Sequence, residues 1–170
     1  MTDVTQQANI KNMRDYMNEV LGRMIALMAT KHAGQIDKAG RPYILHPIAV
    51  MNMLSAEYPD DYELMCIGIG HDGVEDTKTT YKELYELGCT DRIVNGIKAM
   101  TRLPGQTEEE YQLGVLENPD AIKVKMKDII HNSDIRRLKG LEDKDFARAQ
   151  KYQKFYIRLR KAEYELNRGK

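Results

Sequence analysis

The sequence predicts an all-α protein, and three observations support this prediction. Helix-forming residues dominate the chain. Strand-like alternation of apolar and polar residues is nearly absent, and helix breakers divide the chain into about eight helical segments. With 170 residues, 42% of them hydrophobic, the chain can bury one core but is too short for two ordinary domains. We therefore expect one helical bundle over residues 1–170.

Apolar spacing and capping residues place the helices. In the first helix, about Asn9 to Thr30, apolar residues recur every three or four positions. Pro47 suits the first turn of a second helix that begins at His46 and ends near Tyr58. The remaining helices are expected at about 59–71, at 81–87 with Thr79 or Thr80 as the cap, and at 91–100, 107–117, 119–135 and 144–167.

The last of these helices is highly charged. Phe155, Ile157, Leu159 and Tyr164 supply its candidate apolar stripe, and the charged residues are expected to form a solvated face. The motifs described below lie before it, in a core of about residues 30–136.

Composition excludes several classes of function. Lys and Arg together number 26, as do Asp and Glu, so no bulk charge attracts nucleic acid or an anionic membrane. No apolar stretch approaches the roughly 20 residues that span a bilayer, and the N-terminal residues lack the apolar core of a signal peptide. Cys66 and Cys89 lack the spacing of a metal site. The expected location is the cytoplasm.

The first polar cluster follows the apolar helix that ends near His71. Asp72 is adjacent to His71, and Glu75 and Asp76 lie three and four residues beyond Asp72, so one helical turn would direct three carboxylates to one region. Four such groups in six residues suit a metal or catalytic site. An exposed acidic turn with a surface histidine is the alternative, and for an isolated His-Asp pair it is the better interpretation.

The second cluster lies within the segment VKMKDIIHN. Asp128, His131 and Asn132 share one face of a helix whose other residues are largely apolar. A buried carboxylate is costly unless it is paired or bound to metal. A surface ion pair of Asp128 with Lys125, Lys127 or an arginine explains the cluster equally well at this point.

Together with His46, which precedes them in the chain, the clusters provide a set of two imidazoles and two carboxylates, from His46, His71, Asp72 and Asp128. This set suits a divalent transition metal such as manganese, iron or zinc. Glu75 or Asp76 would accept or relay a proton in a hydrolysis reaction. The basic residues Lys38, Arg41 and Lys125 are candidates to neutralise a polyphosphate, with Asn132 as a neutral hydrogen-bonding partner.

The order of three segments resembles a known family. HAGQIDKAGRPYILHPIAV, GHDGVEDT and VKMKDIIHN occur in the order found in the HD-type hydrolase domain of the RelA/SpoT alarmone enzymes. The resemblance spans most of the chain from His32 to Asn132 and is far more specific than the His-Asp pair alone. In its short length, the chain resembles the single-domain small alarmone hydrolases rather than the long bifunctional enzymes.

This resemblance implies a specific reaction. Manganese would be held by the two histidines and two aspartates named above, while Glu75 and Asp76 serve the attacking water. The 3′-pyrophosphate of guanosine 3′,5′-bis(diphosphate)-type alarmones would be removed, which gives GDP or GTP and pyrophosphate. Lys38 and Asn132 would contact the nucleotide.

Two positions depart from the family pattern. Asp37 stands where the family has an arginine that stacks on the base, and a carboxylate cannot make that cation–π contact. Asp37 is instead an acceptor for a base amino group or a solvent-facing residue, and Arg41 is a nearby candidate to replace the arginine. Gly73 replaces a bulkier residue, so the turn there is looser or admits another substrate group.

The expected partner is a small-molecule nucleotide substrate, with no nucleic acid or membrane partner, and homo-oligomerisation stays open. Two alternatives remain beside alarmone hydrolysis. One is an HD phosphohydrolase of another nucleotide, such as a dNTP or a phosphorylated cofactor. The other is a non-catalytic nucleotide-binding module, because a fold does not guarantee activity.

Overall fold

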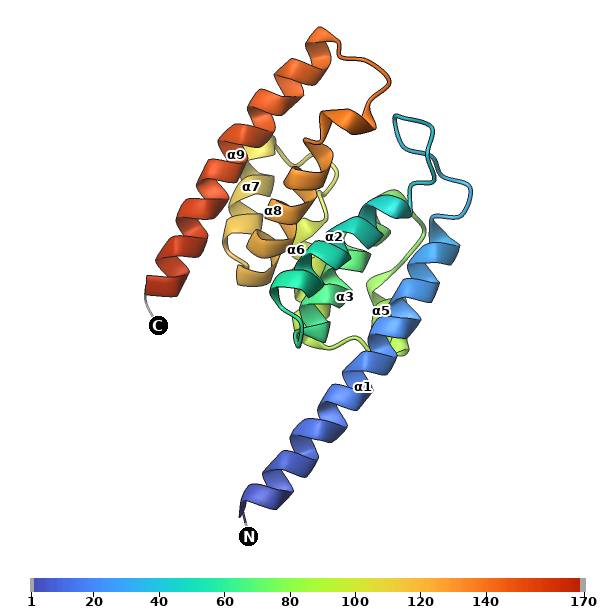
Figure 1. The fold of residues 1–170 in the computed structure, drawn as a ribbon, viewed down its shortest axis with the longest axis vertical. Coiled ribbons are helices and arrows are strands. Elements are labelled where there is room, and N and C mark those ends of the chain that lie inside the picture. The colour runs from blue at the N-terminus through green and yellow to red at the C-terminus, as the bar shows by residue number, and fades with distance from the viewer. Residues whose placement is uncertain (1, 169–170) are drawn as a thin grey trace.

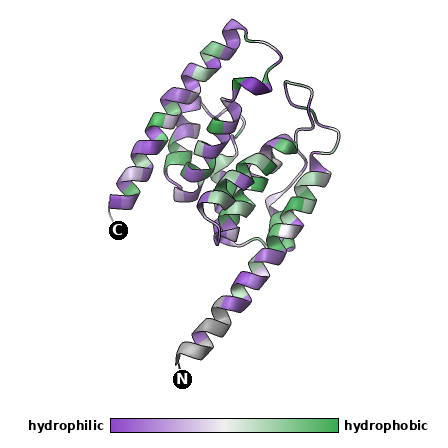
Figure 2. Cartoon of the chain, in the orientation of Figure 1, coloured by the Kyte–Doolittle hydropathy of each residue, from purple (hydrophilic) through white to green (hydrophobic). Residues whose placement is uncertain are grey.

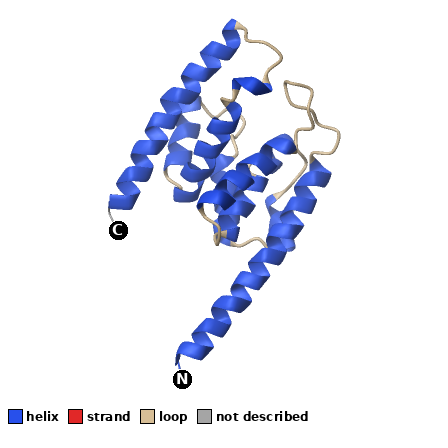
Figure 3. Cartoon of the chain, in the orientation of Figure 1, coloured by secondary structure: helices blue, strands red, loops and turns tan. Residues whose placement is uncertain are grey.

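The computed structural model describes residues 2–168, without the side chains of residues 2–5 and 7–10. The predicted all-α class is confirmed, because this part of the chain forms helices and no strand beyond an isolated bridge between Ile36 and Pro42 (Figures 1 and 3). The elements are α1 (Thr2–Lys31), α2 (Leu45–Glu57), α3 (Tyr62–Gly70), α4 (Gly73–Asp76), α5 (Tyr81–Leu87), α6 (Asp91–Met100), α7 (Glu108–Leu116), α8 (Pro119–Asn132), η1 (Ile135–Arg137) and α9 (Asp143–Arg168).

Side-chain caps fix most helix starts. Thr80 accepts a hydrogen bond from the backbone N–H of Glu83 at the start of α5, and Thr107 and Glu110 form a capping box at the start of α7. Asn118 caps α8 just before Pro119. These are the positions at which the sequence predicts helix starts, because a capping side chain satisfies N–H groups that lack an intrahelical partner.

Three helix boundaries differ from the prediction. Helix α1 starts at Thr2 rather than near residue 9. Helix α3 starts at Tyr62 rather than near residue 59, because Asp61 caps it by accepting from the backbone N–H of Leu64. Helix α8 ends at Asn132 rather than near residue 135. Asp134 then caps the short η1 by accepting from the backbone N–H of Arg136, so the chain changes direction there.

Helix α3 lies at the centre of the packing. It contacts α1, α2, α6 and α8, and every residue from Leu64 to Gly70 is buried. Helix α9 packs along α8 and α7 on the side away from α1, while the first turns of α1 extend past the other helices (Figure 1). Apolar residues concentrate on the central helices, whereas α9 is largely hydrophilic (Figure 2). None of the described helices has the length and apolar character needed to cross a membrane.

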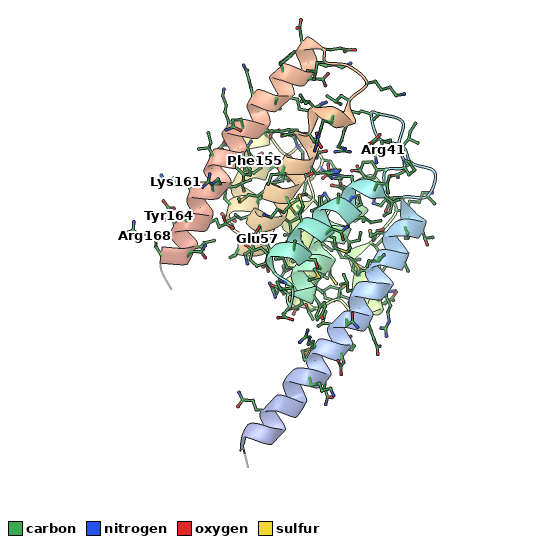
Figure 4. The ribbon with its side chains drawn as sticks, viewed as in Figure 1. Arg41, Glu57, Phe155, Lys161, Tyr164 and Arg168 are labelled. Atoms are coloured by element: carbon green, nitrogen blue, oxygen red, sulfur yellow. The ribbon has the colours of Figure 1, made fainter. Side chains whose placement is uncertain are left out.

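The predicted apolar stripe of α9 is half wrong. Phe155 and Leu159 are buried, but 58% of Ile157 and 61% of Tyr164 is exposed; Figure 4 labels Phe155 and Tyr164. Ile157 lies two residues from each buried position, which turns it about 200° away on a helix. Tyr152 and Tyr156 complete the stripe, because they lie three or four residues from the buried positions and pack against the core.

Glycines allow α3 to lie close to its neighbours. A methyl group added at Gly96 of α6 would lie 2.5 Å from Cδ1 of Ile67 and within 3.0 Å of two more of its carbons. A methyl group at Gly68 would lie 2.5 Å from Cδ1 of Leu54 in α2. These contacts are shorter than carbon atoms tolerate, so both crossings need glycine.

We predict that Gly96→Ala destabilises the protein by about 1–3 kcal/mol, because overpacking at Ile67 outweighs the gain of about 1 kcal/mol in helix propensity. At Gly114 in α7, an added methyl group would have no atom within 4 Å. Gly114→Ala should therefore stabilise the protein by about 0.5–1 kcal/mol. Urea unfolding of both variants measures the difference, and equal effects would contradict a packing role for Gly96.

Candidate metal centre

Four predicted ligands come together from four segments of the chain. His46 lies in the first turn of α2, His71 ends α3, Asp72 starts α4 and Asp128 lies in α8. His46, His71 and Asp72 offer ligand atoms that all lie within 4.8 Å of one another. Oδ1 of Asp128 is 3.2 Å from Nε2 of His46 and 3.8 Å from Nε2 of His71. The tertiary structure thus joins residues that are up to 82 positions apart.

The hydrogen bonds of His71 fit a cation at this site. Nδ1 of His71 lies 2.8 Å from the carbonyl oxygen of Gly68, so this nitrogen donates. Nε2 is fully buried without a hydrogen bond, although Oδ2 of Asp72 lies 3.0 Å away. In neutral His71, a lone pair would therefore face a carboxylate, and a divalent cation between these atoms would relieve the repulsion. This donor set fits a divalent transition metal.

Without a cation, the imidazole itself takes up positive charge. Burial disfavours the imidazolium form of His71, but the carboxylates of Asp72 and Asp128 outweigh burial and raise its pKa to about 10. Burial likewise opposes ionisation of Asp72, yet His71 and His46 hold the pKa of that carboxyl well below its usual range. The site is built around negative charge that requires a positive partner.

Asp128 is both a buried site residue and an ion-pair partner. Its Oδ2 lies 2.8 Å from Nζ of Lys125, and its Oδ1 accepts a hydrogen bond of 2.5 Å from Asn132. Both interpretations of the second cluster are therefore partly realised, but the Lys125–Asp128 pair is inside the protein rather than on the surface. Burial opposes ionisation of Asp128, while Lys125 and the two histidines lower its pKa.

A chain of hydrogen bonds reaches His46 at Nδ1, the ring nitrogen that does not face the two aspartates. Its Nδ1 lies 2.7 Å from Nδ1 of His131, and the same nitrogen of His131 lies 2.8 Å from Nη1 of Arg137. Burial, then the positive charges of Arg137 and His46, lower the pKa of His131 to about 4, so this ring is neutral at pH 7. Arg137 was missed from the sequence, because it follows the motif and is separated from it by a helix end.

The two predicted proton-handling acids occupy different surroundings. The Tyr43 hydroxyl lies 2.6 Å from Oδ2 of Asp72 and 3.0 Å from Oδ2 of Asp76, so its single proton is shared between a ligand candidate and a catalytic candidate. Glu75 instead accepts from the backbone N–H of Arg102 at 2.8 Å. Tyr43 was missed from the sequence because nothing in its local pattern shows that its ring turns toward α4.

Packing against α1 explains why a glycine stands at position 73. A methyl group at this position would lie 2.6 Å from the sulfur of Met28 in α1 and 3.1 Å from its terminal carbon. The side chain of Met28 therefore fills the space beside Gly73. The substitution reflects the local packing of α1 against α4 and does not open the site to substrate.

A cavity of about 370 Å³ opens beside His46. Its walls include three of the predicted substrate contacts, namely Asp37, Lys38 and Asn132. The complete lining is Ile36, Asp37, Lys38, Ala39, Tyr43, His46, Asn132, Asp134, Arg137, Leu138, Arg148 and Tyr152. Arg148 and Tyr152, one helical turn apart on α9, were missed because the charges of that helix were assigned to a solvated face. Arg41 is exposed and does not line this cavity (Figure 4).

Asp37 is held by the loop itself. Its Oδ1 accepts from the backbone N–H groups of Ala39 and Arg41, both at 2.9 Å, and its Oδ2 lies 3.1 Å from Nη2 of Arg137. Burial opposes its ionisation, but the N–H of Arg41 and the guanidinium of Arg137 lower its pKa. The carboxylate that replaces the family arginine thus shapes the loop and pairs with a second arginine.

Comparison with known proteins supports the resemblance to the alarmone hydrolases. The chain is 40% identical over 99 residues to the zebrafish guanosine-3′,5′-bis(diphosphate) 3′-pyrophosphohydrolase MESH1, a match that covers 55% of each protein. It is 32% identical over 111 residues to the bifunctional (p)ppGpp synthase/hydrolase SpoT of Escherichia coli and 33% identical over 121 residues to an Aquifex aeolicus pyrophosphohydrolase. The resemblance to the alarmone hydrolases is confirmed.

A solved structure shows the same fold. It belongs to a metazoan SpoT orthologue described as hydrolysing ppGpp, and it matches with a TM-score of 0.69 and 21% identity over 88% of this chain and 94% of that one. No family model matches the sequence. The matched regions span about half of the zebrafish protein but only 16% and 17% of the bacterial ones.

Metal binding to the folded site should stabilise the protein. We predict that Mn²⁺ at about 100 times its dissociation constant raises the free energy of unfolding by about 2.7 kcal/mol, because the unfolded chain lacks the assembled site. Asp72→Asn should abolish this increase, whereas Asp60→Asn, at a side chain that is 75% exposed, should retain it. Denaturant unfolding with and without Mn²⁺ provides the measurement. An unchanged increase in Asp72→Asn would show that the ion binds elsewhere.

Proposed function

We propose that this protein is a divalent-metal-dependent pyrophosphohydrolase of guanosine 3′,5′-bis(diphosphate)-type alarmones. The observation that carries the proposal is the cluster of buried His46, His71 and Asp128 with half-buried Asp72, which lies beside a polar cavity lined by Lys38 and Asn132. Relatives named for this activity are 40% identical to the chain over 99 residues and 33% identical over 121 residues. Hydrolysis would use one water and yield pyrophosphate and the nucleoside 5′-diphosphate or 5′-triphosphate.

In this proposal, the four clustered side chains hold the metal. When bound, a divalent ion supplies Lewis-acid chemistry to a phosphoryl oxygen and to water. Asp76 is proposed to accept a proton from the attacking water, and the contact of its carboxylate and that of Asp72 with one Tyr43 hydroxyl supports this role. Glu75 is proposed to assist this proton transfer. Lys125 and Asn132 keep Asp128 oriented and ionised.

A second cavity supports a substrate with phosphates at both ends. It has a volume of about 840 Å³ and shares Lys38, Leu138 and Arg148 with the cavity beside His46. Among the described residues, Lys38 and Lys139 on its wall have no ion-pair partner within 4.0 Å. Lysine side chains bind phosphate as point charges. A nucleotide in the first cavity would thus find cations for its second polyphosphate group.

Manganese is the proposed metal because the resemblance to the alarmone hydrolases implies it, and two imidazoles with two carboxylates suit manganese as they do iron or zinc. We also propose that residues 1–170 act as one domain in the cytoplasm. The buried thiols of Cys66 and Cys89 are free in the structure, which suits a reducing compartment.

The direct test is hydrolysis of guanosine 3′,5′-bis(diphosphate) by the full chain. We expect Mn²⁺-dependent release of pyrophosphate and GDP, loss of turnover with a chelator, and loss of turnover in Asp72→Asn. Adenosine alarmones and dNTPs belong in the same panel, because the base-stacking arginine of the family is absent at Asp37. Turnover of a dNTP alone would establish a different phosphohydrolase. No turnover with Mn²⁺, Fe²⁺ or Zn²⁺ would refute an enzymatic role.

Tyr43→Phe should lower kcat/KM about 10- to 100-fold without unfolding the protein, since it removes one hydroxyl that orients Asp72 and Asp76. Tyr85→Phe is the matched control, because Tyr85 donates to Asp91 on the surface. Steady-state kinetics at saturating Mn²⁺ checks the prediction. Equal activity of the two variants would contradict a role for the Tyr43 hydroxyl.

A further inference from the structure

Arg137 connects the loop that carries Asp37 to the helix that carries Asp128. It ends η1, and only 17% of its side chain is exposed. Nη2 lies 3.1 Å from Oδ2 of Asp37, while Nη1 lies 2.8 Å from Nδ1 of His131 and 3.0 Å from the carbonyl oxygen of that residue. One guanidinium therefore joins segments 100 residues apart in the sequence.

The chemistry of these groups fixes the direction of each hydrogen bond. A guanidinium only donates, so Nδ1 of His131 must accept from Arg137. Nδ1 of His46 lies 2.7 Å from that same acceptor nitrogen, so an unprotonated Nδ1 on His46 would place two lone pairs against each other. His46 must then donate from Nδ1. In the neutral ring, this leaves Nε2 without a proton.

The position of Nε2 gives this tautomer its importance. Nε2 of His46 lies 3.2 Å from Oδ1 of Asp128 and 3.5 Å from Oδ2 of Asp72, on the side of the proposed metal. A histidine binds metal through an unprotonated nitrogen, and the hydrogen bond at its other nitrogen sets which nitrogen that is. Without the donor at Arg137, His131 would be equally able to donate from Nδ1, which would move the proton of His46 to Nε2.

We propose that Arg137 is a positioning residue for the metal centre: held by Asp37, it keeps Nδ1 of His131 an acceptor and thereby directs the unprotonated Nε2 of His46 to the metal. This inference rests on the proposed function for the identity of the site. It also gives Asp37 a purpose, because a carboxylate at this position anchors Arg137, whereas an arginine there would repel it.

The neighbouring arginine provides a matched control. Arg136 has the same side chain one position earlier, but it is 87% exposed and pairs with Asp134 through its Nε and Nη2. Arg136→Met removes the same charge from the same segment without touching the histidines. A general electrostatic or folding effect would thus appear in both variants, and a positioning effect only in Arg137→Met.

The experiment measures Mn²⁺ binding alone, through the electron paramagnetic resonance signal of the unbound ion, in the full chain without substrate. Arg137→Met should weaken Mn²⁺ binding about 10- to 100-fold, as loss of a partner behind a ligand does. Arg136→Met should change it by no more than about twofold. Asp37→Asn should weaken binding in the same direction but less, and it tests the idea even if Arg137→Met fails to fold.

A double-mutant cycle with His131→Ala shows whether Arg137 acts through His131. We expect Arg137→Met to add no further loss of Mn²⁺ affinity in the His131→Ala background. Wild-type affinity in both Arg137→Met and Asp37→Asn, or an equal loss with and without His131, would overturn the inference. At saturating Mn²⁺, kcat of Arg137→Met should return to the wild-type value. If Arg137 instead contacted the nucleotide, its loss would raise KM and leave Mn²⁺ binding unchanged. If the variants change Mn²⁺ binding as expected but the wild-type protein hydrolyses no alarmone, the proposed function is refuted and the positioning role of Arg137 stands.

Discussion

The charge balance at the carboxylates of half-buried Asp72 and buried Asp128 is the interaction on which the site depends. Moving a carboxylate out of water costs several kcal/mol unless an opposite charge or strong hydrogen bonds compensate. Here the compensating groups are His46, His71 and Lys125, and they come from α2, from the end of α3 and from α8. Packing of these helices around α3 therefore creates the site.

A shell of hydrogen bonds orients each of these charged groups. The carbonyl of Gly68 fixes His71, the hydroxyl of Tyr43 fixes Asp72, and Asn132 fixes Asp128. Each contact decides which atom of the side chain faces the centre. Groups that are oriented in advance need little reorganisation when charge develops in a reaction, which is the general source of electrostatic catalysis.

The two departures from the family pattern have a common physical explanation. Gly73 leaves the space that Met28 fills, and Asp37 offers the charge that Arg137 neutralises. In each case the unusual residue contacts a second residue that complements it, by size at Gly73 and by charge at Asp37. A substitution viewed alone suggested a change in substrate, whereas its structural partner points to local packing or to a relocated guanidinium.

The sequence by itself determined the helical class, most helix boundaries and the set of polar residues that gather near His71. The helical class and the boundaries depend on local rules, because capping and three- to four-residue periodicity act within one or two helical turns. The polar residues were instead identified from the types of side chain and the order of the motifs along the chain. Local rules also explain where the prediction for α9 failed: Ile157 and Tyr164 are off the buried stripe that the helix period selects.

Only the tertiary structure decided the partners of these residues. Asp128 was equally compatible with a surface ion pair and a buried site, and the structure shows a buried carboxylate that contacts Lys125 and faces both histidines. The bonds of Tyr43 to Asp76 and of Arg137 to Asp37 join positions 33 and 100 residues apart. Such pairs depend on how whole helices pack, and no local pattern in the sequence specifies that geometry.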